Sequence, residues 1–192
     1  MSLVARYVHQ HAGDEGLRRV HAAAGLGAPV EALDDERHWF TYEEKIALFE
    51  AAAAELDDAD VTRHMGERAL LLQVGTGLRV LLRSLGSPRM VLANVARVAP
   101  KFSTVATMDV LELGRTHAVI SYELRSDKVP HRLDCLYHQG LISVIGPLFG
   151  MPLPEVDHPE CQVLGAPRCI YKVRWARRHG RRVNAHRKRQ HL

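Results

Sequence analysis

The sequence has no long hydrophobic run. Its 192 residues are 46% hydrophobic, yet no stretch approaches the roughly 20 apolar residues that span a bilayer. The N-terminal segment MSLVARYVHQHAGDEG also has no apolar run of signal-peptide length. These absences argue against a membrane protein and a secreted one, so we expect a cytoplasmic protein with no membrane partner.

Cysteines and aromatic residues are scarce. Three cysteines are too few for a disulfide-rich secreted scaffold, which again favours a reducing compartment. Aromatic residues make up 6% of the chain, and none follows Trp175. The C-terminal segment therefore has no platform on which nucleic-acid bases could stack.

Acidic residues are missing from the C-terminal end. Nine Lys or Arg residues and no acid lie between Lys172 and Arg189, whereas the rest of the chain is slightly acidic despite a net charge of +4. Blocks of like charge are usually solvated tails. We therefore expect 177–192 to be a basic tail or the start of a linker to an output domain, rather than a nucleic-acid-binding segment.

Hydrophobic periodicity predicts an α+β fold. Helical patterns fill the first half, where Thr41 and Glu44 form a capping box, and they cover 14–27, 38–58, 60–73, 75–86 and 87–102. Alternation over 104–124 predicts a hairpin, 129–150 returns to helix, and 155–175 predicts a second hairpin. We expect one domain over 1–176, with an N-terminal helical layer packed on antiparallel hairpins.

The last hairpin brings two cysteines together. Gly165 is midway between Cys161 and Cys169, so a turn centred there places the two residues opposite each other, about 4.5–5.5 Å apart. A reducing compartment disfavours a disulfide. Two interpretations stay open, namely metal ligands and small buried hydrophobic side chains.

Further ligands are available for a metal. His158 precedes Cys161 by three residues, and Cys135 lies on the preceding helix. Three thiolates and an imidazole form a closed tetrahedral zinc set within 131–176. His138, one helical turn after Cys135, is an alternative fourth ligand. Asp157 and Glu160 are also near, although Glu160 should point to the opposite strand face from Cys161.

These residues carry a resemblance. The segments CLYHQGLISVIGPLFG and PEVDHPECQVLGAPRCIYKVRW resemble the C-terminal part of the vinyl-4-reductase domain family, as found in the N-terminal sensors of phenol- and xylene-responsive bacterial transcription activators. The resemblance implies zinc on Cys135, Cys161 and Cys169, with His158 replacing a carboxylate. It also implies a homodimer whose fold is related to the nitric-oxide-sensor and vesicle-tethering families.

The resemblance further implies a cavity for a small hydrophobic ligand. The candidate lining residues are Phe102, Met108, Val110, Tyr122, Tyr137, Phe149 and Val156, with Ile120, Ile145, Trp39 and Phe40 as further candidates. The stretch before Cys135 lacks the tryptophan that contacts phenol in the phenol sensors, so we do not expect phenol itself. His117 or Tyr122 is available as a polar contact.

The expected function is a zinc-stabilised sensory domain that controls a signalling output. A reductase-like enzyme is the first alternative, but the sequence has no dinucleotide fingerprint and no nucleophile elbow, and Ser121 and Ser143 lack an evident catalytic partner. We therefore expect no enzymatic activity. The second alternative is a haem or gas sensor with His117 or His138 as axial ligand, although no haem motif is present.

Overall fold

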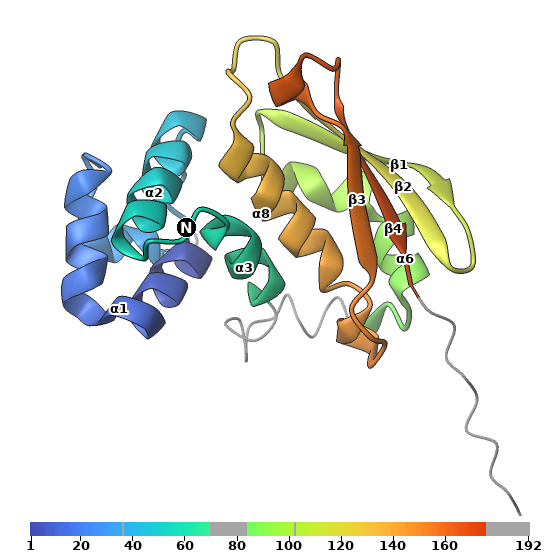
Figure 1. Cartoon of the computed structure of the whole chain (residues 1–192), viewed down its shortest axis with the longest axis horizontal. Helices are drawn as coiled ribbons and strands as arrows, with labels where there is room; N and C mark the ends of the chain where they lie inside the picture. Colours follow the sequence, from blue (N-terminus) through green and yellow to red (C-terminus); the bar gives the residue numbers. More distant parts are fainter. Residues whose placement is uncertain (36, 70–83, 102, 176–192) are drawn as a thin grey trace, which may run out of the picture.

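The computed structural model describes residues 1–35, 37–69, 84–101 and 103–175. Figure 1 shows α1 and α2 on one side, the sheet on the other, and α3 and α8 between them. The helices are α1 Ser2–Ala23, α2 Tyr42–Glu55, α3 Val61–Glu67, α6 Pro88–Ala93, α7 Val95–Val98 and α8 Arg132–Ser143. The short 3₁₀ helices are η1 Val30–Leu33, η2 Ala99–Lys101, η3 Pro147–Phe149 and η4 Gln162–Leu164.

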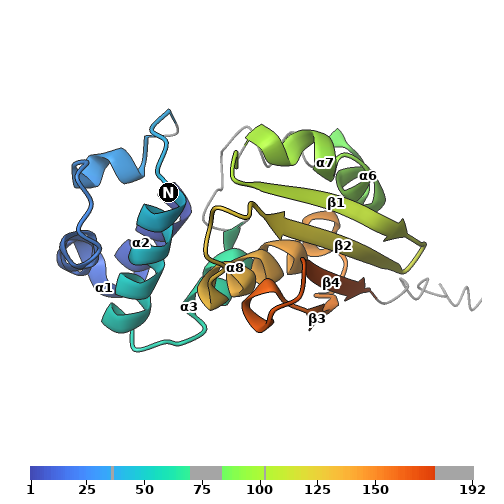
Figure 2. The same ribbon diagram turned by 90° about the horizontal axis from the view of Figure 1, so that it is seen from above.

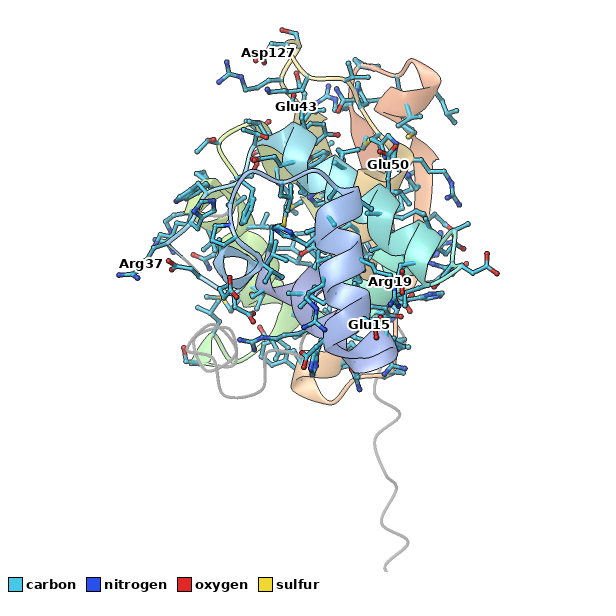
Figure 3. The ribbon with its side chains drawn as sticks, turned by 90° about the vertical axis from the view of Figure 1, so that its left-hand side faces the viewer. Glu15, Arg19, Arg37, Glu43, Glu50 and Asp127 are labelled. Carbon is cyan, nitrogen blue, oxygen red and sulfur yellow. The ribbon has the colours of Figure 1, made fainter. Side chains whose placement is uncertain are left out.

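The helix α1 is longer than the sequence predicted. It begins at Ser2 and has a kink at Gly13, whose φ of +68° is not helical. The part after the kink corresponds to the predicted helix over 14–27. Arg19 in this part pairs with Glu55 of α2 at 2.6 Å and with Glu15 at 3.2 Å, on the side of the molecule seen in Figure 3.

The helix α2 begins as predicted. The Thr41 hydroxyl accepts from the Glu44 N–H at 3.1 Å, and the Glu44 carboxylate accepts from the Thr41 N–H at 2.7 Å. This reciprocal capping box satisfies two backbone donors at the helix start. Leu48, Phe49 and Ala52 follow at helical spacing and are fully buried. The pattern of this segment therefore determined both where the helix begins and which face it buries.

Two predicted helices are divided in the structure. The predicted helix over 87–102 starts at Pro88 as expected but breaks at Asn94, whose side-chain amide donates to the Met90 carbonyl at 2.7 Å and so competes with the helical backbone. The predicted helix over 129–150 ends at Ser143. Pro147 lacks an N–H and cannot continue it, and the following turn stops at Gly150 with φ +71°.

Four antiparallel strands form one sheet in the order β1-β2-β4-β3. Their bounds are β1 Ala106–Leu113, β2 His117–Leu124, β3 Glu155–Glu160 and β4 Cys169–Arg174. Ile120 pairs with Tyr171 and Tyr122 pairs with Cys169, so these side chains share one face of the sheet. That face is buried against α8 and α6, while Lys172 and Arg174 point to solvent. Both predicted hairpins are confirmed.

The described residues form two hydrophobic cores. The helical core joins α1, α2 and α3 around Val8, Phe49 and Met65, and the sheet core surrounds Ile120 and Tyr171. The helix α8 contributes to both cores, and Figure 2 shows it between α2 and the sheet. None of the described helices is long and apolar enough to cross a membrane.

Three predictions fall outside the described residues. The helix predicted over 75–86 lies largely within 70–83. Phe102, a candidate pocket residue, and the basic segment 176–192 are also outside them. The structure therefore does not test these three predictions.

Candidate metal centre

Cys135 lies on the side of α8 that faces the sheet. His131 caps this helix, because its ring Nδ1 accepts from the Leu133 N–H at 3.3 Å. The Cys135 side chain is buried in the sheet core, and the Tyr171 hydroxyl donates to the Cys135 carbonyl at 3.2 Å. The helix therefore holds this thiol against β4.

Cys161 and Cys169 flank the turn of the β3–β4 hairpin. Gly165 follows η4 with φ +89°, a conformation that favours glycine. Glu160 pairs with Ile170, so the register beside the turn is centred on Gly165, as predicted. Cys161 follows β3 directly, and Cys169 begins β4 with 1% of its surface exposed.

A β-bulge places His158 beside the thiols. Residues three apart in a regular strand point to opposite faces, so His158 and Cys161 could not meet on an undisturbed β3. The register with β4 shifts between Asp157 and Glu160. Pro159 lies in this interval and has no N–H to contribute to the ladder. The bulge therefore lets both potential ligands face inward.

The four side chains converge on one point. The Cys135 sulfur lies 3.7 Å from that of Cys161 and 3.8 Å from that of Cys169. One ligand atom from each of Cys135, His158, Cys161 and Cys169 lies within 4.8 Å of all the others. A tetrahedral zinc ion with bonds to sulfur of about 2.3 Å requires sulfur atoms about 3.8 Å apart. The measured separations fit that requirement.

The imidazole of His158 has a ring nitrogen without a hydrogen bond. Its Nε2 is buried and has no hydrogen-bond partner among the described residues. The ring stacks on Tyr171, with centroids 4.4 Å apart and planes inclined by 17°, which fixes its orientation. A buried nitrogen without a partner is costly unless it binds something, and a metal ion would satisfy it.

The thiols differ in acidity. The hydrogen bond with Cys135 lowers the pKa of Cys169, and the His158 ring and the Gln162 N–H, 3.4 Å from the sulfur, act in the same direction. The same hydrogen bond to Cys169, together with burial, raises the pKa of Cys135. The surroundings of Cys169 therefore favour its thiolate, which is the form that binds metals.

The alternative ligands lie elsewhere. His138 Nδ1 is 2.8 Å from the carbonyl of Asp134, and His138 is not among the four converging residues. Asp157 pairs with Arg174 at 2.7 Å on the solvent side. Glu160 is exposed, as strand parity predicted. The geometry thus favours His158 as the fourth member of the cluster.

Comparison with known protein families matches residues 16–154 to the arabinose-binding domain of AraC transcription regulators, an N-terminal domain. This match covers most of the chain. The chain belongs to this family. It is therefore a sensor domain of a transcription regulator, the coarser part of the predicted identity. Of the four converging residues, this family match includes Cys135 but not His158, Cys161 or Cys169.

Solved structures support the same class of fold for this AraC-family sensor domain. A mutant H-NOX protein from K. algicida, in the Fe(II) unliganded state, is 14% identical, with a TM-score of 0.68 over 93% of this chain and 98% of that chain. An H-NOX protein from S. oneidensis in the Fe(II)NO state is 14% identical, with a TM-score of 0.69 over 92% and 100%. A structure from work on haem distortion in the H-NOX family is 11% identical, with a TM-score of 0.67 over 92% and 93%. These likenesses confirm an α+β sensor fold similar to that of nitric-oxide sensors. Comparison with curated protein sequences gave no significant match.

The AraC-family sensor domain contains a buried polar cluster that the sequence analysis missed. Asp134 on α8 is 2% exposed. Its carboxylate accepts from Lys45 Nζ of α2 at 2.6 Å and from the Tyr122 hydroxyl of β2 at 2.9 Å. His138 lies against Tyr122 with ring centroids 4.1 Å apart. The available signal was an acid inside the apolar helical pattern RLDCLYHQGL, because an acid there needs a partner.

Charge balance explains why this acid is tolerated. Burial alone would raise the pKa of Asp134, but His138, Lys45 and the Tyr122 hydroxyl outweigh it and hold the pKa below its ordinary value. Burial lowers the pKa of His138 despite the neighbouring carboxylate. The 2.6 Å pair between Lys45 and Asp134 links the helical core to the sheet core.

The two histidines considered as haem ligands have different environments. His117 lies at the start of β2, where its Nε2 pairs with Glu112 at 2.7 Å and 42% of the side chain is exposed. His138 is 13% exposed, and its Nδ1 is engaged by the Asp134 carbonyl. Histidine ligands of metals commonly hold their second nitrogen in this way. Of these two histidines, His138 is the more buried, and one of its ring nitrogens is engaged by the backbone.

The predicted pocket residues are divided between the two cores. Met108, Val110, Tyr122 and Val156 belong to the sheet core, together with Ile120 and Ile145, whereas Tyr137 and Phe40 belong to the helical core. Phe149 is half-buried in η3, and Trp39 is 59% exposed. The candidate residues thus come from both cores, and most of those in the described part of the chain lie in the sheet core.

Proposed function

We propose that this AraC-family sensor domain is stabilised by a structural zinc ion, binds a small hydrophobic ligand and controls a C-terminal output domain. The observation that carries the zinc proposal is the convergence of three sulfurs and one imidazole nitrogen within 4.8 Å. The vinyl-4-reductase type of sensor, the homodimer, the cytoplasmic location and the absence of enzymatic activity belong to the same proposal.

The proposed zinc has a mechanical role. One proposed ligand, Cys135, lies on α8. The other three belong to the hairpin, with His158 in β3, Cys161 directly after β3 and Cys169 at the start of β4. Four protein ligands leave no open coordination position for catalysis, which is typical of structural zinc. The ion supplies bonds that tie α8 to the β3–β4 hairpin, and the free energy of binding becomes free energy of folding.

Replacement of the ligands tests this proposal. We expect one zinc per chain in the wild-type protein, measured by elemental analysis after purification without added metal. C161S and C169S should lose the metal and melt at least about 5 °C lower, which corresponds to roughly 2 kcal/mol for a domain of this size. E160Q is the matched control, because Glu160 lies in the same hairpin but is exposed, and it should keep both zinc and stability. Zinc-free wild-type protein, or full zinc in both serine variants, would contradict the proposal.

A haem or gas sensor is the second candidate. The likeness to H-NOX domains over most of the chain supports it, as does the buried ring of His138 with an engaged Nδ1. In this candidate His138 would hold the haem iron, and the iron would supply the site at which a gas binds. Absorption spectra of the same preparation, titrated with hemin, distinguish the two. A Soret band that is lost in H138A and kept in H117A favours haem, whereas one zinc per chain without a Soret band favours the first proposal.

A further inference from the structure

A surface hollow lies at the end of the molecule where β4 finishes. It has a volume of about 320 Å³ and is lined by Ser87, Pro88, Arg89, Gly114, Arg115, Met151 and Trp175. The start of α6, the β1–β2 turn and the end of β4 meet there, as can be followed at the right-hand end of Figure 2. None of the candidate pocket residues from the sequence lines it, and neither does any member of the Cys135 cluster.

The charged residues that line this hollow are all basic. Arg89 and Arg115 both line it, and no acidic residue does. Among the described residues, neither arginine has an ion-pair partner. Glu112, the acid closest in sequence to the turn, is engaged by His117 at 2.7 Å. Two arginines without an ion-pair partner among the described residues therefore lie at this hollow, and arginine recognises planar carboxylates through paired hydrogen bonds.

The wall beside the arginines is apolar and rigidly held. Trp175 is 8% exposed, and its indole N–H donates to the Arg115 carbonyl at 3.1 Å. Its backbone N–H donates to the Thr116 carbonyl at 3.0 Å. Met151, half-buried, adds a polarisable thioether. An indole ring and a thioether next to guanidinium groups suit a molecule with an apolar body and an anionic end.

We propose that this hollow binds a small organic anion with an aliphatic or aromatic body, such as a carboxylate. The inference deepens the proposed function, on which it rests, because it gives the chemical class of an effector. Trp175 is also the residue at which β4 passes into 176–192. An anion bound here would lie beside the hydrogen bonds that join Trp175 to Arg115 and Thr116 of the β1–β2 turn.

Tryptophan fluorescence tests the inference. The chain has two tryptophans, and Trp39 is 59% exposed, so W39F leaves Trp175 as the reporter in the full chain. Benzoate and octanoate serve as probes, with benzyl alcohol and octan-1-ol as neutral analogues of similar size. We expect a saturable change with the carboxylates and binding at least about tenfold weaker for the alcohols, as lost hydrogen bonds to charged groups imply.

Charge removal provides the second measurement. R89Q and R115Q, both at exposed positions, should each weaken carboxylate binding at least about tenfold. R18Q is the matched control, because Arg18 is exposed on α1 and is distant in sequence from Arg89 and Arg115. It should leave carboxylate binding unchanged. Equal binding of acid and alcohol, no saturable response, or equal behaviour of R89Q, R115Q and R18Q would overturn the inference. The zinc content is measured in the same samples. One zinc per chain without carboxylate binding would refute this inference alone, whereas a protein without zinc would refute the proposed function.

Discussion

At the scale of single residues, Pro159 and Asp134 are the sequence neighbours of the candidate ligands His158 and Cys135. Pro159 lies in the bulge that turns both His158 and Cys161 inward. Asp134 precedes Cys135 on α8 and is fixed by Lys45 and Tyr122. Pro159 thus lies within the bulge between the hairpin ligands, and Asp134 joins α8 to both α2 and β2.

The Lys45–Asp134 pair gives a prediction at this scale. D134N leaves the ammonium of Lys45, whose side chain is 21% exposed, without its counter-charge. Breaking a largely buried pair costs about 3 kcal/mol, and we expect a loss of that order in the free energy of unfolding, measured by urea denaturation. The double variant K45M/D134N should lose clearly less than the sum of the two single losses.

Glu43 supplies the control for that measurement. It also bridges α2 to the segment before α8, through Lys128 at 3.0 Å, but 63% of its side chain is exposed. E43Q should therefore change stability by about 1 kcal/mol or less. If D134N behaved like E43Q, the buried pair would not be the link between the two cores.

At the scale of elements, α3 and α8 cross unusually closely. Gly66 and Gly140 lie at the crossing, and a Cβ added to Gly66 would be 2.6 Å from the Tyr137 carbonyl oxygen. The absence of side chains therefore lets the two backbones approach. The contact brings Thr62 against the start of α8, where its hydroxyl donates to the Leu133 carbonyl at 2.7 Å.

We predict that G140A destabilises the protein although alanine favours helices. A Cβ at Gly140 would collide with the backbone of α3 at Arg63 and Gly66, and overpacking of this kind typically costs about 1–3 kcal/mol. Thermal unfolding followed by circular dichroism measures the effect. G27A is the control, because nothing lies within 4 Å of a Cβ there. Equal melting temperatures for the two variants would show that the helices separate without cost.

At the scale of the whole molecule, two hydrophobic cores share one helix. The helical core contains no cysteine, whereas all three thiols belong to the sheet core or pack against it. A metal in the Cys135 cluster would therefore act on one half of the molecule. The Lys45–Asp134 pair and the glycine crossing join the other half to it.

Metal removal should separate these two halves in hydrogen exchange. On the proposed zinc site, a strong chelator should speed amide exchange in β3 and β4 first, while α1 and α2 keep their protection, because local opening follows cooperative units. Mass-spectrometric exchange on peptides from each region measures this. The chelator should have no further effect on C161S. A uniform increase across both cores, or none, would contradict a role confined to the hairpin and α8.

The sequence by itself determined the features that depend on neighbouring residues. The Thr41–Glu44 box and the turn centred on Gly165 both follow from local backbone chemistry. The sequence also named the candidate ligands Cys135, His158, Cys161 and Cys169. Their spacing alone did not decide between a metal site and buried cysteines, and the family resemblance favoured the metal site. Local hydrogen bonding also divides the predicted helix at Asn94, but the pattern of hydrophobic residues does not reveal such competition.

Tertiary structure alone decided the rest. Lys45 and Asp134 are 89 positions apart, and no local pattern indicates which distant cation a buried acid will meet. The bulge that unites His158 and Cys161 depends on pairing with β4. The hollow at Arg89, Arg115 and Trp175 exists because three segments distant in sequence end at the same place. Such contacts arise from packing between elements, which periodicity along the chain does not encode.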